Sequence, residues 1–245
     1  MLKKIIIANW KMNPQTLEEA KGIFNSIKKT ANKLNKVETI ICPPFVYLYS
    51  LKANGAQDIF YEERGSFTGE ISAEMVKDVG VKYVIIGHSE KRRMGDTDDM
   101  INRKIKLALN AGLKIIFCIG EKTRDIESKY LGFIKNQIET GLKGVVKKYF
   151  SNIIFAYEPV WAIGAGSQAD SPESTLRTVM FIKRRLFGIF GEELTKKTPI
   201  LYGGSVSVKN AKDFLENAGI QGLLVGRESL NAKNFSEILK MANNL

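Results

Sequence analysis

Short apolar runs alternate eight times with segments of helical periodicity along the 245 residues of the chain. Such runs are typical of strands covered on both faces, and their alternation with helices favours a parallel sheet joined by crossover helices. We expect strands around residues 5–9, 39–42, 59–61, 81–86, 114–119, 153–157, 200–202 and 223–225. Because no glycine-rich dinucleotide turn follows the first run, the pattern predicts an α/β fold of the closed (β/α)8 barrel type rather than an open doubly wound sheet.

Several of the expected helices follow residues that are well suited to cap them. A Ser, Thr or Asn before a helix accepts hydrogen bonds from its first free N–H groups, and a proline fits the first helical position. We expect helices to begin after Thr16 (with Glu19), after Ser171 (with Pro172) and at Asn234 (with Glu237).

The composition contains no sign of a second domain or of a membrane span. No Pro- or Ser-rich linker and no low-complexity tract interrupts the chain, so we expect residues 1–245 to form one barrel domain. No apolar run approaches the roughly 20 residues that a membrane span requires, which argues against a membrane as partner. Two cysteines, Cys42 and Cys118, make no disulfide framework and indicate a reducing, cytoplasmic setting.

The formal net charge of +11 raises nucleic acid as a possible partner. The basic residues, however, are scattered in pairs over many segments, and no recognition helix, zinc-binding spacing or aromatic RNA-binding run accompanies them. We therefore expect no nucleic-acid partner, while a positive field remains able to steer an anionic substrate.

The apolar run 153–157 ends at a carboxylate. Glu158 precedes Pro159, which cannot continue a strand ladder, so the carboxylate is expected at the C-terminal tip of its strand. Gly164 and Gly166 then give the backbone freedom to fold over a small anion and open again. This order is typical of a general base beside a lid, although a strand-end Glu that pairs with a Lys before an ordinary glycine turn is compatible with the same residues.

Polar residues and glycines follow several other expected strands. Because the carboxyl ends of barrel strands meet at one mouth, we expect convergence of Asn9, Lys11, His88, Glu158, Ser205 and Gly226. His88 is the only histidine of the chain, and a lone histidine at a strand end is most often a surface or structural residue. Here a helical turn should follow it, and the positive end of that turn favours a neutral imidazole.

Seven segments of the chain resemble the triosephosphate isomerase family in amino-acid sequence, order and spacing. They are ANWKMN at 8–13, CPPF at 42–45, FTGEIS at 67–72, YVIIGHSE at 83–90, AYEPVWAIGAG at 156–166, YGGSV at 202–206 and LLVG at 223–226. The resemblance covers essentially the whole chain and implies a TIM barrel. It also implies the interconversion of dihydroxyacetone phosphate and D-glyceraldehyde 3-phosphate through an enediolate, with no metal or organic cofactor.

The resemblance implies roles for the residues at the mouth. Glu158 would move the proton between adjacent carbons, while His88 and Lys11 stabilise the enediolate; a neutral histidine in that role is an established example from this family. Asn9 would donate to the same region, and Glu90 would be a partner of Lys11 or of a network on the substrate side.

A second set of residues is implied for the phosphate and for assembly. The backbone of 203–205 and 224–226, with the lid residue Gly164, would hold the phosphate, and Arg227 is included in that site. The loop that carries Thr68 resembles the segment that family members insert into a neighbouring subunit toward Asn9 and Lys11, which implies a homodimer.

The chain departs from the family pattern in the lid and after the last strand, and also in a segment between His88 and Gly95 that is one residue short and at Gln221, where an acidic residue is usual. Ala165 and Ser167 stand at lid positions that are commonly Thr and Lys, which alters the hydrogen bonding of the lid. Arg227 and Glu228 stand where a second glycine and an alanine are common, so we expect the side chain to point away from the phosphate. Two other functions are compatible with such a chain: a phosphate-binding barrel enzyme for a larger substrate, or an inactive basic barrel that acts as a binding protein.

Overall fold

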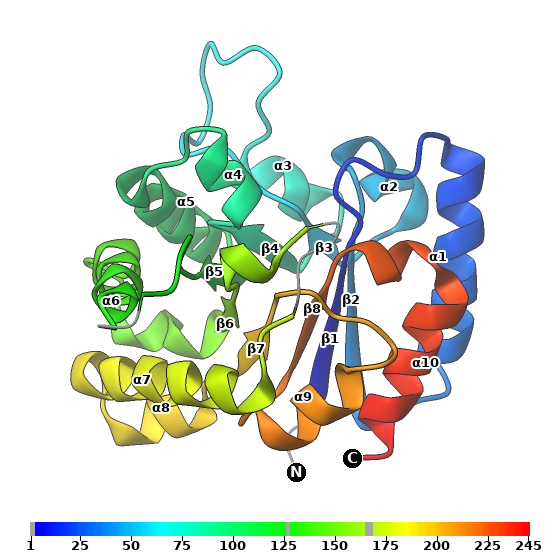
Figure 1. Cartoon of the computed structure of the whole chain (residues 1–245). Coiled ribbons are helices and arrows are strands. Elements are labelled where there is room, and N and C mark those ends of the chain that lie inside the picture. Colours follow the sequence, from blue (N-terminus) through cyan, green and yellow to red (C-terminus); the bar gives the residue numbers. More distant parts are fainter. Residues whose placement is uncertain (1–2, 126–127, 165–168) are drawn as a thin grey trace.

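The protein is described by a computed structural model that covers residues 3–125, 128–164 and 169–245 (Figure 1). Eight parallel strands form one sheet in the order β2-β1-β8-β7-β6-β5-β4-β3. The strands are β1 (Lys4–Asn9), β2 (Val37–Cys42), β3 (Gly55–Ala56), β4 (Tyr83–Ile86), β5 (Lys114–Ile119), β6 (Ile153–Tyr157), β7 (Ile200–Tyr202) and β8 (Gly222–Val225). The sheet curls into a nearly closed barrel with helices between its strands, which confirms the predicted (β/α)8 fold.

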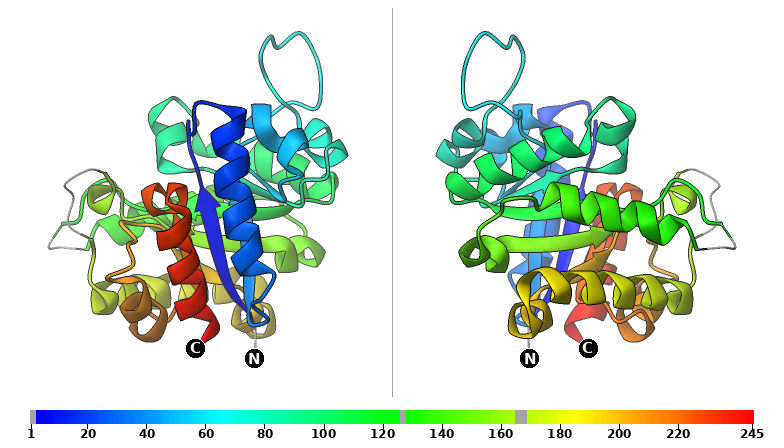
Figure 2. Two further views of the ribbon diagram at one scale, coloured as in Figure 1. Left: turned by 90° about the vertical axis from the view of Figure 1, so that its right-hand side faces the viewer. Right: turned by 90° about the vertical axis from the view of Figure 1, so that its left-hand side faces the viewer.

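Helices connect successive strands and cover the outside of the barrel (Figure 2). The α-helices are α1 (Leu17–Ala31), α2 (Leu48–Leu51), α3 (Ala73–Asp78), α4 (Ser89–Arg93), α5 (Asp98–Asn110), α6 (Tyr130–Gly141), α7 (Pro172–Phe190), α8 (Glu192–Lys197), α9 (Ala211–Asn217) and α10 (Ala232–Asn243). Short 3₁₀ turns are η1 (Phe45–Tyr47), η2 (Lys147–Asn152), η3 (Val160–Ala162) and η4 (Arg227–Leu230). The loop around residues 62–69 projects from the body of the barrel in both views of Figure 2.

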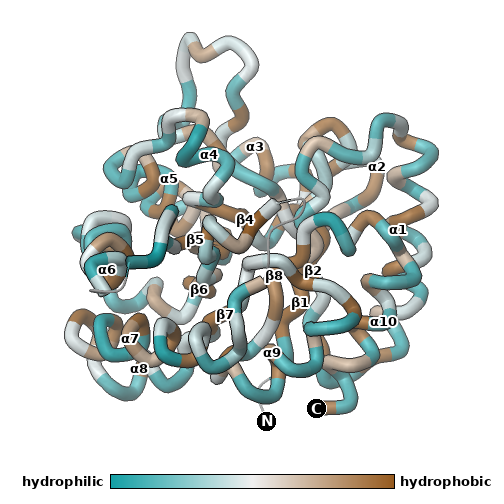
Figure 3. The backbone as a smooth tube through the Cα atoms, in the orientation of Figure 1, coloured by the Kyte–Doolittle hydropathy of each residue, from teal (hydrophilic) through white to brown (hydrophobic). Residues whose placement is uncertain are grey.

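The core has two layers because strand side chains alternate between the barrel interior and the helices. The interior layer is small and includes Ile7, Ile40, Ile85 and Leu201. The larger outer layer packs the other strand face against the helices, and Figure 3 shows the hydrophobic strands inside a more polar shell. Burial of both faces explains why the strands appear in the sequence as apolar runs rather than as alternating patterns.

The prediction of a third strand at residues 59–61 is wrong, since β3 is formed by Gly55 and Ala56. Gly55 lies so close to β2 that an added Cβ would stand 2.5 Å from Cys42 Sγ and 2.8 Å from Ile40 Cγ2. Small residues are therefore required where the barrel is tightest, and the more conspicuous apolar residue Ile59 lies beyond the strand.

Side-chain amides hold β2 beside the segment that begins β3. Asn54 accepts a hydrogen bond from the backbone N–H of Ile41 at 3.0 Å and donates to the carbonyl oxygen of Thr39 at 3.0 Å. Gln57 donates to the carbonyl oxygen of Cys42 at 2.9 Å. Since β2 and β3 are the two ends of the sheet order in the described residues, these amides replace a strand ladder at the seam of the barrel.

The predicted helix caps are correct at two of the three positions. Thr16 accepts from the N–H of Glu19, and Ser171 caps α7 with Pro172 in its first turn. The cap expected at Asn234 is wrong: α10 begins earlier, where Asn231 accepts from the N–H groups of Lys233 and Asn234. Asn234 lies inside the first turn of α10, and its side chain donates to Glu228 at 2.7 Å.

Candidate active site

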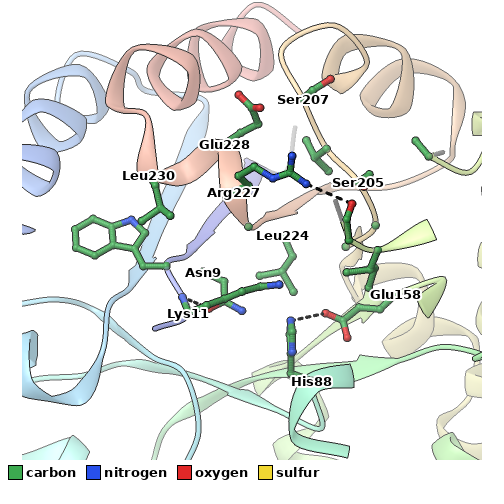
Figure 4. A pocket seen from close by; sticks show the side chains of 18 of the residues that line it. Asn9, Lys11, His88, Glu158, Ser205, Ser207, Leu224, Arg227, Glu228 and Leu230 are labelled. Atoms are coloured by element: carbon green, nitrogen blue, oxygen red, sulfur yellow. Dashed lines mark hydrogen bonds and ion pairs between the residues drawn. The ribbon is translucent and has the colours of Figure 1, made fainter. Parts of the chain in front are cut away.

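A cavity of about 590 Å³ opens at the carboxyl ends of the strands. Residues from β1, β4, β6, β7 and β8 or from the loops after them line it (Figure 4). Of the residues proposed from the sequence, the structure brings together Asn9, Lys11, His88, Glu158, Gly164, Ser205, Gly226 and Arg227 around this cavity. Glu90 and Thr68 do not line it; Thr68 is exposed on the projecting loop.

Glu158 is fixed at the tip of β6. Its side chain is only 2% exposed, and its backbone N–H donates to Ile119 O at 2.8 Å. Its Oε2 accepts a hydrogen bond from the N–H of Ser89 at 3.0 Å. Its Oε1 lies 3.2 Å from His88 Nε2 but accepts no well-aligned hydrogen bond from any described residue. One carboxylate oxygen is thus anchored, and the other is buried with acceptor capacity to spare on a residue that lines the cavity.

The thiol of Cys118 lies beside the same carboxylate from β5. Burial, and secondarily the charge of Glu158 and a hydrogen bond with it, raise the pKa of Cys118 well above its ordinary value. The thiol therefore stays protonated and serves as a weak donor next to Glu158.

The imidazole of His88 has a defined tautomer. Its Nδ1 accepts a hydrogen bond from the N–H of Glu90 at 3.2 Å, at the start of α4. A ring nitrogen that accepts carries no proton, so in this geometry the ring is neutral and its proton is on Nε2. That nitrogen faces Glu158 Oε1 and the cavity (Figure 4). The ring is positioned to donate a hydrogen bond from a neutral state.

Lys11 has an uncommon left-handed backbone, with φ of 55°. Two side-chain contacts hold it: Asn9 Oδ1 accepts from its N–H at 3.1 Å, and Gln57 Nε2 donates to its carbonyl oxygen at 2.8 Å. Its ammonium contacts Glu90 Oε1 at 2.8 Å. A non-glycine residue in this conformation persists only where its surroundings enforce it, and such residues gather at functional sites.

The carboxylate of Glu90 is stabilised in its charged form. Burial acts to raise its pKa, but the hydrogen bond and charge of Lys11, with a smaller contribution from Arg93, outweigh burial, so the pKa lies below its ordinary value. Glu90 therefore stays a permanent anionic partner for the ammonium of Lys11 near neutral pH.

Gln57 is a contributor that sequence reasoning missed. It joins the carbonyl oxygens of Cys42 and Lys11, and so ties the end of β2 to the loop after β1. The misplacement of β3 concealed it, because a strand at 59–61 would have put Gln57 before the strand instead of just after it.

The opposite end of the cavity is lined by backbone. In the described part of the chain, the N–H groups of Gly204, Ser205 and Gly226 donate to no other residue. Asn210 shapes the loop after β7, since it donates to Ser205 O at 2.9 Å and accepts from the N–H of Ser207 at 2.8 Å. Free backbone N–H groups beside a cavity are ordinary ligands for a phosphate or another small anion.

The expectation that the Arg227 side chain points away from this end is wrong. Its guanidinium reaches across the mouth and donates to Gly164 O at 3.3 Å, because that carbonyl offers an acceptor on the facing loop. Glu228 turns to Asn234 instead. The altered lid residues Ala165 and Ser167, and the glycine Gly166, lie outside the described residues.

Two further findings concern partners. Among the described residues, no three His, Cys, Asp or Glu side chains gather in a way that would hold a metal ion. The described helices also include none that combines the length and apolar character needed to cross a bilayer.

A buried carboxylate, a neutral imidazole and an ammonium face a backbone-lined anion site across one barrel mouth. This arrangement is typical of (β/α)8 enzymes that act on small phosphorylated substrates. Within that class, the chain belongs to the triosephosphate isomerase family, whose model matches residues 4–242.

Relatives support the same family over the full length. The chain is 41% identical over 250 residues to the triosephosphate isomerase of Carboxydothermus hydrogenoformans, with 98% of this chain and 99% of that protein covered. It is 44% identical over 252 residues to that of Dehalococcoides mccartyi strain BAV1, with 98% and 97% covered. It is 42% identical over 248 residues to that of Aquifex aeolicus, with 97% and 99% covered.

Proposed function

We infer that this chain interconverts the triose phosphates dihydroxyacetone phosphate and D-glyceraldehyde 3-phosphate, since its family and its relatives carry the name triosephosphate isomerase. The chain is therefore an isomerase of triose phosphates, and the reaction it catalyses belongs to glycolysis. The two alternatives considered from the sequence, an enzyme for a larger phosphorylated substrate and an inactive binding protein, gain no support from the family or the relatives.

We propose that Glu158 is the general base. The observation that carries this proposal is the Oε1 atom of Glu158, a residue that lines the cavity: the atom is buried, lies 3.2 Å from His88 Nε2 and accepts no well-aligned hydrogen bond from a described residue. A desolvated carboxylate with one anchored oxygen is suited to remove a proton from the carbon next to a carbonyl and return it to the neighbouring carbon.

His88 and Lys11 are proposed to stabilise the enediolate that forms between these two proton transfers. A neutral imidazole that donates from Nε2 can hydrogen-bond the developing oxyanion without first losing a charge. The ammonium of Lys11 supplies the positive charge, and the amide of Asn9 lines the same wall. Both oxygens of the enediolate would thus find donors at one end of the cavity.

The phosphate is proposed to lie at the other end, on the free N–H groups of Gly204, Ser205 and Gly226 and close to Gly164. This separation places the reacting carbons beside Glu158 while the loops hold the phosphate. Retention of the phosphate matters chemically because an enediolate that reaches water readily eliminates it.

A coupled assay on D-glyceraldehyde 3-phosphate tests the assignment directly. The unmodified protein should turn over rapidly, toward the diffusional ceiling for which this family is a standard example. Glu158→Gln should lower kcat by about 10²–10⁴-fold, because the amide cannot accept the proton. Equal turnover by both proteins would refute Glu158 as the base.

A homodimer is also proposed. Large apolar side chains stand exposed in segments along the upper edge of Figure 1, where α2, α3, α4 and the projecting loop lie. They are Met12, Val46, Tyr49, Phe67, Met75 and Met94, and four of them are more than three-quarters exposed. Large apolar side chains exposed on several segments at one side of a molecule are typical of an interface, and Thr68 lies on the loop that would enter the partner.

Sedimentation velocity tests the dimer. The unmodified chain should sediment as a dimer, and Met75→Lys should shift it toward a monomer with lower activity. Lys21→Met, at an exposed site on α1, should leave the sedimentation coefficient unchanged. A fully active monomer would refute the proposed exchange of the Thr68 loop.

Two more expectations remain as proposals. One is a single domain over residues 1–245, which is supported by the family match from 4 to 242 and predicts one cooperative unfolding transition. The other is the cytoplasm as compartment, supported by two free, buried cysteines and testable by cell fractionation.

A further inference from the structure

The side chain of Arg227 connects the two loops that border the anion end of the cavity. Arg227 directly follows Gly226 at the end of β8, and its guanidinium crosses to Gly164 O on the loop that follows β6. Figure 4 shows it extending over the cavity toward the side that carries Ser205. It is a charged side chain at an end of the site that otherwise offers backbone N–H groups.

Among the described residues, the guanidinium of Arg227 donates to the carbonyl oxygen of Gly164 and to no other acceptor. A guanidinium presents five N–H donors in a planar fork, and the contact with Gly164 occupies one of them. In the part of the chain that the structure describes, no carboxylate lies within ion-pair distance of Arg227. The adjacent carboxylate of Glu228 accepts from Asn234 at 2.7 Å instead.

Arg227 differs in this respect from the other cation of the cavity. The ammonium of Lys11 already contacts Glu90 at 2.8 Å, and it lies at the end of the cavity where Asn9, His88 and Glu158 are found. No described carboxylate compensates the charge of Arg227 at the cavity wall. The residue stands beside the free N–H groups of Ser205 and Gly226.

We propose that Arg227 is a phosphate-specificity residue: its guanidinium donates to the phosphate of the substrate while it keeps its hydrogen bond to Gly164 O. This inference rests on the proposed function only for the identity of the phosphate ester. The planar fork can serve both acceptors at once, so affinity for the phosphate is coupled to the position of Gly164. Backbone N–H groups alone provide no such coupling.

Calorimetric titration with inorganic phosphate tests the contact without turnover. Arg227→Met removes the fork and charge but keeps an unbranched side chain, and should weaken phosphate binding about three- to tenfold. Arg227→Lys should recover part of this loss, because it restores the charge without the fork. Lys209→Met is the matched control: it removes the same charge from an exposed position near Ser207 and Asn210 that does not line the cavity, and should change the dissociation constant less than about twofold.

Kinetics then separate a phosphate contact from a general effect on the loop. In Arg227→Met, KM for D-glyceraldehyde 3-phosphate should rise by the same factor as the phosphate dissociation constant. The kcat/KM for unphosphorylated D-glyceraldehyde, measured at high enzyme concentration, should not change.

Unchanged phosphate affinity in Arg227→Met would overturn the proposal, and so would an equal loss of kcat/KM for the unphosphorylated substrate. If the unmodified protein bound phosphate through Arg227 yet failed to isomerise triose phosphates, the proposed function would fail while the phosphate contact stood.

Discussion

Gly120 and Glu158 lie so close together that a Cβ on Gly120 would stand 1.8 Å from the carbonyl oxygen of Glu158. The end of β5 therefore has no room for any side chain beside the proposed base. The close approach lets Glu158 donate its N–H to Ile119 and places its carboxylate against Ser89.

Gly120→Ala should displace Glu158 and lower both activity and stability. We expect kcat/KM to fall about a hundredfold or more, since a displacement near 1 Å has effects of that size. The free energy of unfolding should fall by about 3 kcal/mol or more because the backbone must move. The comparison is Gly132→Ala in α6, where a Cβ meets nothing within 4 Å; this change should leave activity intact and stabilise the helix by up to about 1 kcal/mol. Coupled assays and urea unfolding measure both, and equal behaviour of the two variants would contradict the expectation.

His88→Gln should replace the neutral imidazole donor with an amide donor on a side chain of different length. We expect kcat to fall by about 10²–10³-fold with KM changed only a few-fold, because the contact strengthens as the oxyanion develops. Circular dichroism should show a folded barrel. An unchanged kcat in a folded variant would assign His88 a structural role.

Gln57→Leu tests a residue whose side chain contacts Lys11 only at the backbone carbonyl oxygen of that lysine. Loss of the hydrogen bond to Lys11 O should relax the left-handed backbone and lower kcat/KM about ten- to a hundredfold, with a smaller effect on unfolding. Gln15→Leu is the control, because Gln15 also donates to a backbone carbonyl of this loop, that of Met12, but is exposed. A larger loss of activity in Gln15→Leu would argue against positioning by Gln57.

Lys104→Met should destabilise the protein in a manner that depends on pH. Lys104 is buried and contacts both oxygens of Asp58 at 2.9 Å and Asp96 at 2.6 Å. Burial raises the pKa of Asp58, and the charge and hydrogen bond of Lys104 oppose this rise. Without Lys104, Asp96 loses its ion pair while Asp58 retains Lys91 at 3.2 Å, which should cost about 3 kcal/mol of unfolding free energy near pH 7.

The sign of the pH dependence follows from the direction of that pKa. A carboxyl group whose pKa is higher in the folded than in the unfolded protein binds its proton more tightly when the protein is folded. Its contribution to stability is therefore present below the ordinary carboxyl pKa of about 4 and is lost as pH rises through the raised pKa of the folded state. The difference between Lys104→Met and the unmodified protein should therefore shrink on acidification. Lys82→Met, at an exposed site, should show no comparable trend, and urea unfolding at several pH values measures it. A difference independent of pH would point to lost packing alone.

Local sequence signals predicted the parts of the fold that depend on local burial. The strand at Lys114–Ile119 was placed residue for residue, because residues 115–119 form an unbroken apolar run and a glycine follows it. The strand at Gly55–Ala56 was missed, since tight packing there selects small residues that resemble a turn.

The site shows a similar division. The positions of Asn9, Lys11, His88 and Glu158 follow from the rule that strand ends share one mouth. The contacts of Gln57 with Lys11, and of Arg227 with Gly164, join residues that are 46 and 63 positions apart. No local periodicity records such pairs, so they became visible only in the folded chain.

The seam between β2 and β3, which hydrogen bonds of side-chain amides hold together, has a consequence for heat inactivation. Asn54 and Gln57 join these strands by side chains, whereas continuous backbone ladders join all other neighbours in the described sheet. Side-chain bonds of this kind open at lower free energy than a ladder, so amide hydrogen exchange at Ile41 should be faster than within β5 or β6. Because Gln57 also holds Lys11, such a local opening would release the lysine while the rest of the barrel stays folded. Activity should therefore be lost reversibly on warming at temperatures below the midpoint of global unfolding.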